Sequence, residues 1–249
     1  EAAYGLKQRG MNVTVLHLMD RIMERQLDGR ASRMLRQSIE EKGINIITEA
    51  NTEALIGKDG HVNQVRLKDG TVLDADLVVF AVGIRPNIAL AQSAGLRCNR
   101  GILVNDTMQT FDPSIYAVGE CIEHRNQTFG LVEPLWGQAF ICATHLAEHG
   151  SLTFKSPTVP TQLKVSGVDV FSAGNFEPKE DYEDIILNDE KRQIYKRIII
   201  QKDKVIGAVL FGDTEDGMWY AELIADQTPI STFRNKLLFG KDFAMKKAG

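Results

Sequence analysis

The spacing of apolar residues predicts a run of helices and strands from the first residue on. Residues 1–9 place Ala2, Ala3 and Leu6 on one helical face, and the apolar run from Val13 to Leu18 predicts a buried strand. An amphipathic helix is predicted from Asp28 to Lys42, because the following apolar residues recur at every fourth position: Leu27, Ala31, Leu35 and Ile39. A strand at Ile44–Ile47 completes a pattern typical of an α/β fold with a parallel sheet.

Two Asp-Gly pairs follow, Asp59-Gly60 and Asp69-Gly70, and they predict tight hairpin turns. The segment from about 46 to 75 is therefore expected to be an antiparallel meander. The apolar run Asp76–Val82 then predicts one more buried strand, which Gly83 ends.

A second group of elements is expected between residues 88 and 149. Residues 88–112 predict a short helix and a strand around Ile102–Val104. A strand at Ile115–Val118 is expected to end on Gly119, and a helix is expected from about Trp136 to His149.

The composition changes near residue 150. The stretch Ser151–Pro160 has two prolines and little periodicity, which indicates a linker. Beyond it the pattern predicts four strands and then two helices, hence an α+β unit. The strands are Gln162–Ala173, Tyr182–Leu187, Gln193–Gln201 and Val205–Leu210, and the helices are Asp216–Ala225 and Ile230–Leu238.

Composition narrows the class of protein. A formal net charge of −4 argues against a nucleic-acid partner, and no apolar run is long enough to cross a membrane. Three scattered cysteines, Cys98, Cys121 and Cys142, favour a reduced, cytoplasmic setting over a disulfide framework or a metal site. His145 and His149 share a helix face, but we interpret them as a surface pair.

Two glycines mark candidate ligand sites. Gly83 and Gly119 each follow a predicted apolar strand, and ligands of open α/β sheets lie beyond the carboxyl ends of strands. A residue without a side chain lets a ligand approach the backbone closely.

The stretch Thr110–Glu120 (TFDPSIYAVGE) resembles the second FAD fingerprint of the two-dinucleotide flavoprotein reductases. The resemblance implies that Gly119 contacts FAD and that the acid after it accepts a hydrogen bond from a ribityl hydroxyl. That acid is Glu120, one methylene longer than the aspartate of the family.

The segment Ala81–Asn87 resembles the end of the nicotinamide domain of the same family, and Glu1-Ala2-Ala3 resembles the helix after its glycine loop. The resemblance implies a truncated chain, whose glycine loop and first FAD-binding half lie upstream. Glu1, His17 and Gly83 are then expected to border NAD(P)H. His17 stands where an acid would bind the ribose of NAD, so the choice between NADH and NADPH stays open.

Three stretches are similar to the large subunit of assimilatory NAD(P)H nitrite reductase: Val13–Asp28, Phe129–Ala139 and Leu163–Phe176. In that family electrons pass from NAD(P)H to FAD, then to iron–sulfur and siroheme centres, and finally to nitrite. The resemblance places Leu135 and Trp136 near the flavin, where Trp136 packs either on the ring or in the core. It places the iron–sulfur cluster and siroheme in regions beyond Gly249.

The expected architecture is α/β and follows from this resemblance. A partial Rossmann-like NAD(P)-binding domain (1–88) precedes a partial FAD-binding domain (89–150), a linker (151–160) and a small α+β C-terminal domain (161–249). The family's C-terminal domain implies contacts with a second copy of the chain or with a small nitrite reductase subunit.

Two alternatives remain open at this stage. One is a rubredoxin- or ferredoxin-type NAD(P)H reductase of the same fold. The other is a non-catalytic docking or dimerisation fragment. We expect residues 1–249 alone to be inactive and to bind FAD weakly, because the resemblance puts half of the flavin site elsewhere. No catalytic acid or base is assigned, since hydride transfer depends on positioning.

Overall fold

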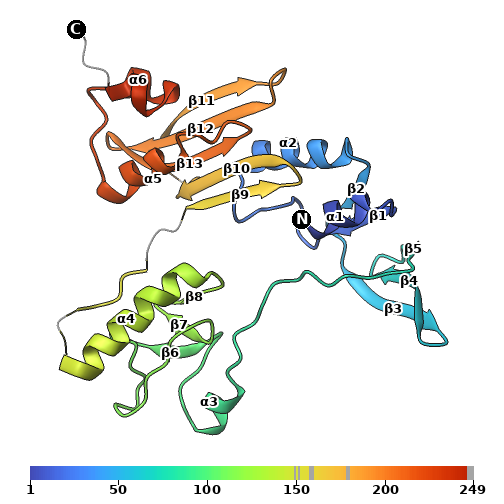
Figure 1. Ribbon diagram of the computed structural model, residues 1–249, viewed down its shortest axis with the longest axis horizontal. Coiled ribbons are helices and arrows are strands. Elements are labelled where there is room, and N and C mark those ends of the chain that lie inside the picture. The colour runs from blue at the N-terminus through green and yellow to red at the C-terminus, as the bar shows by residue number, and fades with distance from the viewer. Residues whose placement is uncertain (149, 151, 157–159, 178–179, 246–249) are drawn as a thin grey trace. The chain divides into compact units, whose positions relative to one another are not determined.

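The computed structural model describes residues 1–148, 150, 152–156, 160–177 and 180–245. These residues form two compact units (Figure 1). The first contains residues up to Val78 together with those from Pro160 onward, and the second runs from Val79 to Val159. Among the described residues, no helix combines the length and the apolar character that a membrane span requires.

The first unit begins with the predicted α/β segment. Helix α1 (Ala2–Gln8) and strand β1 (Val13–Leu16) precede helix α2 (Gly29–Glu40) and strand β2 (Ile44–Ile47). Strands β1 and β2 pair in parallel, as expected. The predicted stripe on α2 is confirmed, because Leu27, Ala31, Leu35 and Ile39 are all buried. The first strand ends at Leu16, two residues earlier than predicted.

An antiparallel meander follows, as predicted. It comprises β3 (Thr52–Lys58), β4 (His61–Leu67) and β5 (Val72–Asp74), in that order in the sheet. Asp59 and Gly60 have φ angles of 53° and 81°, as the tight β3–β4 turn requires. The meander begins at Thr52 rather than near residue 46, because residues 44–47 belong to the parallel pair.

The predicted strand at Asp76–Val82 is wrong. Residues 77–88 have no regular secondary structure, and the side chains of Leu77, Val79, Phe80 and Val82 are exposed. A strand exists only if neighbouring backbone supplies hydrogen bonds, and none of the described strands pairs with this run. Apolar composition alone therefore did not produce a strand here.

The second unit contains α3 (Ala89–Ser93), a small sheet and one long helix. The sheet comprises β6 (Ile102–Val104), β7 (Ile122–His124) and β8 (Gln127–Thr128), with β6 and β7 parallel. Helix α4 (Val132–Glu148) starts one turn earlier than predicted, and its predicted end at His149 lies outside the described residues. The core holds Met108, Ile122, Phe129, Ile141 and Phe154.

The predicted strand at Ile115–Val118 is also wrong, since only Tyr116 forms an isolated bridge, with Gln109. The reason is local: the amide of Ala117 donates to Met108, and the carbonyl of Ile115 accepts from Thr110. The backbone of this run is thus satisfied by a tight reversal instead of a sheet. Part of the predicted linker is anchored as well, because Phe154 is buried and its amide donates to Asp106 at 2.7 Å.

The C-terminal part of the first unit is a five-stranded antiparallel sheet of order β11-β12-β13-β10-β9. Its strands are β9 (Thr161–Val165), β10 (Val168–Gly174), β11 (Glu183–Asp189), β12 (Ile194–Gln201) and β13 (Lys204–Phe211). The single strand predicted at Gln162–Ala173 is a hairpin, because Ser166 and Gly167 take positive φ angles.

Three helical segments follow the sheet. Helix α5 (Gly217–Asp226) is confirmed and buries Trp219 and Tyr220, as expected. The helix predicted at Ile230–Leu238 is instead the 3-10 helix η1 (Arg234–Phe239), followed by α6 (Lys241–Met245).

Both faces of this sheet are covered, and the two covers come from distant parts of the chain (Figure 1). Phe171, Ile198 and Leu210 point into a core shared with α5. The alternate positions, including Val170 and Val209, share a second core with the apolar stripe of α2. This double burial explains why the strand sequences are continuously apolar. It also joins the α/β segment and the C-terminal sheet into one unit.

Candidate functional site

The turn that ends at Gly119 and Glu120 presents an acid at the surface of the second unit. Gly119 has a φ of 103°, and a Cβ built there would meet nothing within 4 Å. Glu120 is exposed and makes no hydrogen bond or ion pair within the described part of the chain. This carboxylate is free to accept a hydrogen bond from a ligand hydroxyl.

Gln138 is a residue of this site that sequence reasoning missed. It lies on α4, is fully buried, and its Oε1 accepts a 2.8 Å hydrogen bond from the amide of Gly119. Its Nε2 is buried without a partner in the described structure. The available signal was an amide side chain that is the only polar one between Pro134 and Thr144 of this helix.

The other two predicted flavin residues lie on α4 in different environments. Leu135 packs partly against the core of the second unit. Trp136 is 73% exposed, so the alternative that it packs in the core is excluded. Val132 and Phe140, at a spacing of four residues on either side of Trp136, are 62% and 63% exposed. The three form an apolar stripe on one face of the helix.

A buried carboxylate supports the sheet of this unit. Glu123, on β7, accepts hydrogen bonds from the side chain of Asn99 and from the amides of Arg100 and Gly101. Burial opposes the ionised form, but these hydrogen bonds outweigh it and lower the pKa of Glu123. The carboxylate on β7 thereby holds the segment that directly precedes β6.

An ion-pair cluster connects the segment just after β6 to the end of β7 in the same sheet. Asp106 accepts from Nη2 and Nε of Arg125, at 2.7 and 2.9 Å, and from Nε2 of His124 at 2.8 Å. The hydrogen bonds from Arg125 and His124 lower the pKa of Asp106 to about 2. His124 is fully buried, with its ring edge-on to Phe154.

In the first unit, an acid lies beside the predicted nicotinamide residue His17. Nε2 of His17 is 3.2 Å from Oε2 of Glu24, and both side chains are partly buried. The structure thus brings an acid from seven residues later in the chain to His17, a contact that spacing did not reveal. Arg25 is exposed near Glu24, and Arg21 is engaged by Glu177 at 2.6 Å.

The remaining predicted nicotinamide residues are Glu1, in the first unit, and Gly83. Glu1 accepts a 3.1 Å hydrogen bond from the amide of Ser166, which ties the start of α1 to the β9–β10 turn. Gly83 has a φ of 77° with open space around it, and it belongs to the second unit. Within the second unit the structure therefore brings together Gly119 and α4, with Glu120 directly after Gly119.

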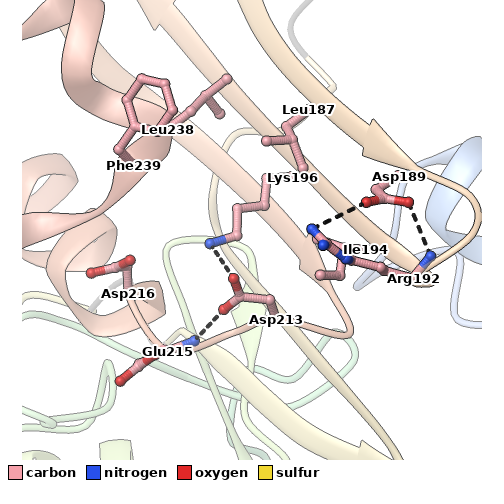
Figure 2. A pocket seen from close by; sticks show the side chains of 10 residues that line it. All are labelled: Leu187, Asp189, Arg192, Ile194, Lys196, Asp213, Glu215, Asp216, Leu238 and Phe239. Atoms are coloured by element: carbon pink, nitrogen blue, oxygen red, sulfur yellow. Dashed lines mark hydrogen bonds and ion pairs between the residues drawn. The ribbon is translucent and has the colours of Figure 1, made fainter.

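A separate cavity of about 370 Å³ lies on the C-terminal sheet (Figure 2). Lys196 is buried there and forms a 2.8 Å ion pair with Asp213, while Arg192 approaches Asp189 at 3.8 Å. Burial opposes ionisation of Asp213, but Lys196 lowers its pKa overall. Both basic side chains that line the cavity are therefore paired with carboxylates of the same cavity.

No group of three His, Cys, Asp or Glu side chains in the described residues is arranged to hold a metal ion. The three cysteines are free. The predicted surface pair of histidines is only half visible, because His149 lies outside the described residues. The Nδ1 of His145 lies 2.8 Å from the hydroxyl of Tyr116.

Comparison with known proteins gives matches along most of the chain. The family described as "Pyridine nucleotide-disulphide oxidoreductase" matches residues 1–139, and the family described as "Rubredoxin NAD+ reductase C-terminal domain" matches residues 160–228. The chain is 48% identical over 231 residues to "Nitrite reductase [NAD(P)H]" of Bacillus subtilis (strain 168), covering 93% of this chain and 29% of that protein.

A second relative from the same organism is the "Assimilatory nitrate reductase electron transfer subunit". It is 40% identical over 238 residues, which is 96% of this chain and 31% of that protein. Among solved structures, a NAD-dependent persulfide reductase from A. fulgidus matches with a TM-score of 0.81 and 28% identity, covering 94% of this chain and 48% of that one. The chain thus spans about 30% of the length of these two curated relatives.

Proposed function

Because the chain belongs to the pyridine nucleotide-disulphide oxidoreductase family, we propose that it forms part of the flavoprotein portion of an NAD(P)H-dependent nitrite reductase. Bound FAD would supply the hydride-accepting and electron-transfer chemistry between NAD(P)H and an acceptor. The residues of this chain bind and orient the two cofactors, and no side chain acts as a general acid or base.

The observation that carries this proposal is the free carboxylate of Glu120. It follows Gly119, whose amide is hydrogen-bonded to Gln138. Gly119 leaves open space, Glu120 has no partner within the described residues, and α4 of the same unit presents the exposed ring of Trp136. An acceptor for a ribityl hydroxyl and an apolar surface for a ring are the features that FAD requires. Gly119, Glu120, Leu135 and Trp136 would hold it.

For the nicotinamide cofactor we assign Glu1, His17 and Gly83, and we add Glu24. A carboxylate at the end of the second strand of a Rossmann fold accepts hydrogen bonds from the ribose hydroxyls of NAD. Glu24 lies beside His17, the residue that directly follows β1, so its carboxylate suits that role and favours NADH. Arg25, exposed next to Glu24, would contact the same ribose when it carries a phosphate.

The rest of the electron path lies outside these residues in our proposal. The relatives are about three times as long as this chain, and an iron–sulfur cluster and siroheme would be held in that additional length. The C-terminal sheet would contact a second copy of the chain or a small nitrite reductase subunit. The three free cysteines suit a reducing, cytoplasmic setting.

A second candidate is a reductase that delivers electrons to a small carrier protein such as rubredoxin. It is favoured by the match of residues 160–228 to the C-terminal domain of rubredoxin NAD+ reductase. The flavin chemistry is the same in both candidates, and only the acceptor differs.

The test is an anaerobic titration of the protein as its gene encodes it, followed by visible spectroscopy. Flavin bands bleached by NADH, with a siroheme band that nitrite reoxidises, are the expected result. Flavin bands that NADH bleaches and nitrite leaves unchanged would favour the carrier reductase. Absence of flavin would contradict both and support a docking module. The same measurement on residues 1–249 checks our expectation of weak FAD binding.

A further inference from the structure

We propose that Gln138 is a positioning residue of the flavin site, which fixes the backbone of Gly119 and donates a second hydrogen bond once FAD is bound. The proposal rests on the function proposed above and deepens it. Gln138 lies 19 residues after Gly119 in the sequence, and its side chain joins α4 to the turn that carries Glu120.

The backbone at Gly119 is not held in place by surrounding side-chain packing. Its φ of 103° lies in a region that side chains rarely adopt, and no atom within 4 Å of the Cβ position holds it there. The 2.8 Å hydrogen bond to Oε1 of Gln138 is the contact that fixes its amide. Because Glu120 follows directly, this bond also sets the direction in which its carboxylate leaves the backbone.

The amide nitrogen of the Gln138 side chain lacks a hydrogen-bond partner in the described structure. Oε1 must face Gly119, since it accepts from an N–H group, and this fixes Nε2 as the remaining atom. Nε2 is buried and has no partner among the described residues. A buried donor without an acceptor destabilises the folded chain. A buried donor of this kind is expected where a ligand supplies the missing acceptor. We therefore assign the partner of Nε2 to an oxygen atom of bound FAD.

Two substitutions separate the two roles. Gln138→Met has a similar volume but neither donates nor accepts strongly. Gln138→Glu keeps an oxygen to accept from Gly119 and, when ionised, has no donor. A protonated glutamic acid regains one O–H donor, so its FAD affinity should recover as the pH falls. Gln92→Glu, on the exposed surface of α3 in the same unit, is the matched control.

The experiment is FAD binding to the flavin-stripped protein as its gene encodes it, with the flavin spectrum and the melting temperature of the stripped protein recorded alongside. We expect about 100-fold weaker binding for Gln138→Met, since two hydrogen bonds are lost, and about tenfold for Gln138→Glu at pH 8. Lowering the pH to 6 should restore part of the Gln138→Glu loss. Gln92→Glu should bind like the unchanged protein.

Unchanged FAD affinity in both Gln138 variants would overturn the proposal and leave the flavoprotein function intact. A lower melting temperature of the stripped variants with unchanged affinity would also overturn it, because the role would then be structural. If the unchanged protein binds no FAD, the proposed function fails first and this inference fails with it.

Discussion

The hydroxyl of Tyr195 donates a 2.8 Å hydrogen bond to Oδ2 of Asp28, which joins strand β12 to the first turn of α2. Asp28 is buried, and its Oδ1 caps α2 by accepting from the amide of Ala31 at 2.9 Å. Arg197 approaches the same carboxylate at 3.3 Å. One side chain therefore begins a helix of the α/β segment and anchors it to the C-terminal sheet. Burial and the bond to Asp28 raise the pKa of Tyr195 above its ordinary value.

Removing this hydroxyl should weaken the first unit. Tyr195→Phe leaves a buried acceptor short of one donor, so we expect a loss of about 1–3 kcal/mol in the free energy of unfolding, measured with urea. Tyr182→Phe is the control, because that ring is exposed and its hydroxyl makes no hydrogen bond in the described structure. Equal effects of the two substitutions would contradict a stabilising role for the Tyr195–Asp28 bond.

Asp106 should make stability depend on pH in the acid range. Its pKa is about 2 in the folded chain, below the ordinary value of 3.8, because Arg125 and His124 favour the charged form. The stabilisation is therefore fully present above pH 4 and is lost as the pH falls towards 2. We expect the stability difference between the unchanged protein and Asp106→Asn to shrink over that window.

The measurement is urea unfolding at several pH values between 2 and 6. Asp59→Asn serves as the control, since Asp59 is an exposed turn residue with no ion pair among the described residues. Its stability difference from the unchanged protein should stay constant across the range. A constant difference for Asp106→Asn as well would show that the cluster around Asp106 contributes nothing.

Glu24 should influence the choice of nicotinamide cofactor. If its carboxylate accepts from the ribose, Glu24→Gln should raise KM for NADH by about tenfold, the value of one charge-assisted hydrogen bond. KM for NADPH should change less, because a ribose phosphate cannot donate to that carboxylate. Steady-state diaphorase kinetics with an artificial acceptor measure both. Glu41→Gln, at the C-terminal end of α2, should leave both KM values unchanged. If it raises KM for NADH as much as Glu24→Gln does, the proposed role of Glu24 is wrong.

A side chain at position 119 should lower stability because of the positive φ angle, not because of crowding. Gly119→Ala meets no steric clash, but the positive φ is unfavourable for alanine, so we expect a loss of about 1 kcal/mol and weaker FAD binding. Gly5→Ala meets equally open space within the helical backbone of α1, so it should stabilise by up to about 1 kcal/mol. Thermal unfolding of the two variants should therefore shift in opposite directions.

Local patterns were enough to predict elements that satisfy their own backbone or repeat a simple turn. The stripe on α2 predicted a helix because its hydrogen bonds lie within the segment. Asp59-Gly60 predicted a hairpin because both residues accept positive φ angles. The glycine and acid at positions 119 and 120 were found in the same way, because a short motif carries them.

The two strands that were predicted and did not form show the limit of such patterns. Asp76–Val82 is as apolar as β13, yet only β13 lies between two strands that accept and donate its backbone hydrogen bonds. Whether an apolar run becomes a strand depends on what lies beside it, which the run itself does not encode.

The sequence by itself determined the helices α1, α2, α4 and α5, the β3–β4 turn and the family, because each depends on residues that are close together in the chain. The tertiary structure decided the rest. It placed α2 and α5 on opposite faces of one sheet, brought Glu24 to His17, and set the buried amide of Gln138 behind Gly119. The physical reason is that burial and hydrogen bonding depend on partners that are distant in sequence, and only the folded chain brings them together.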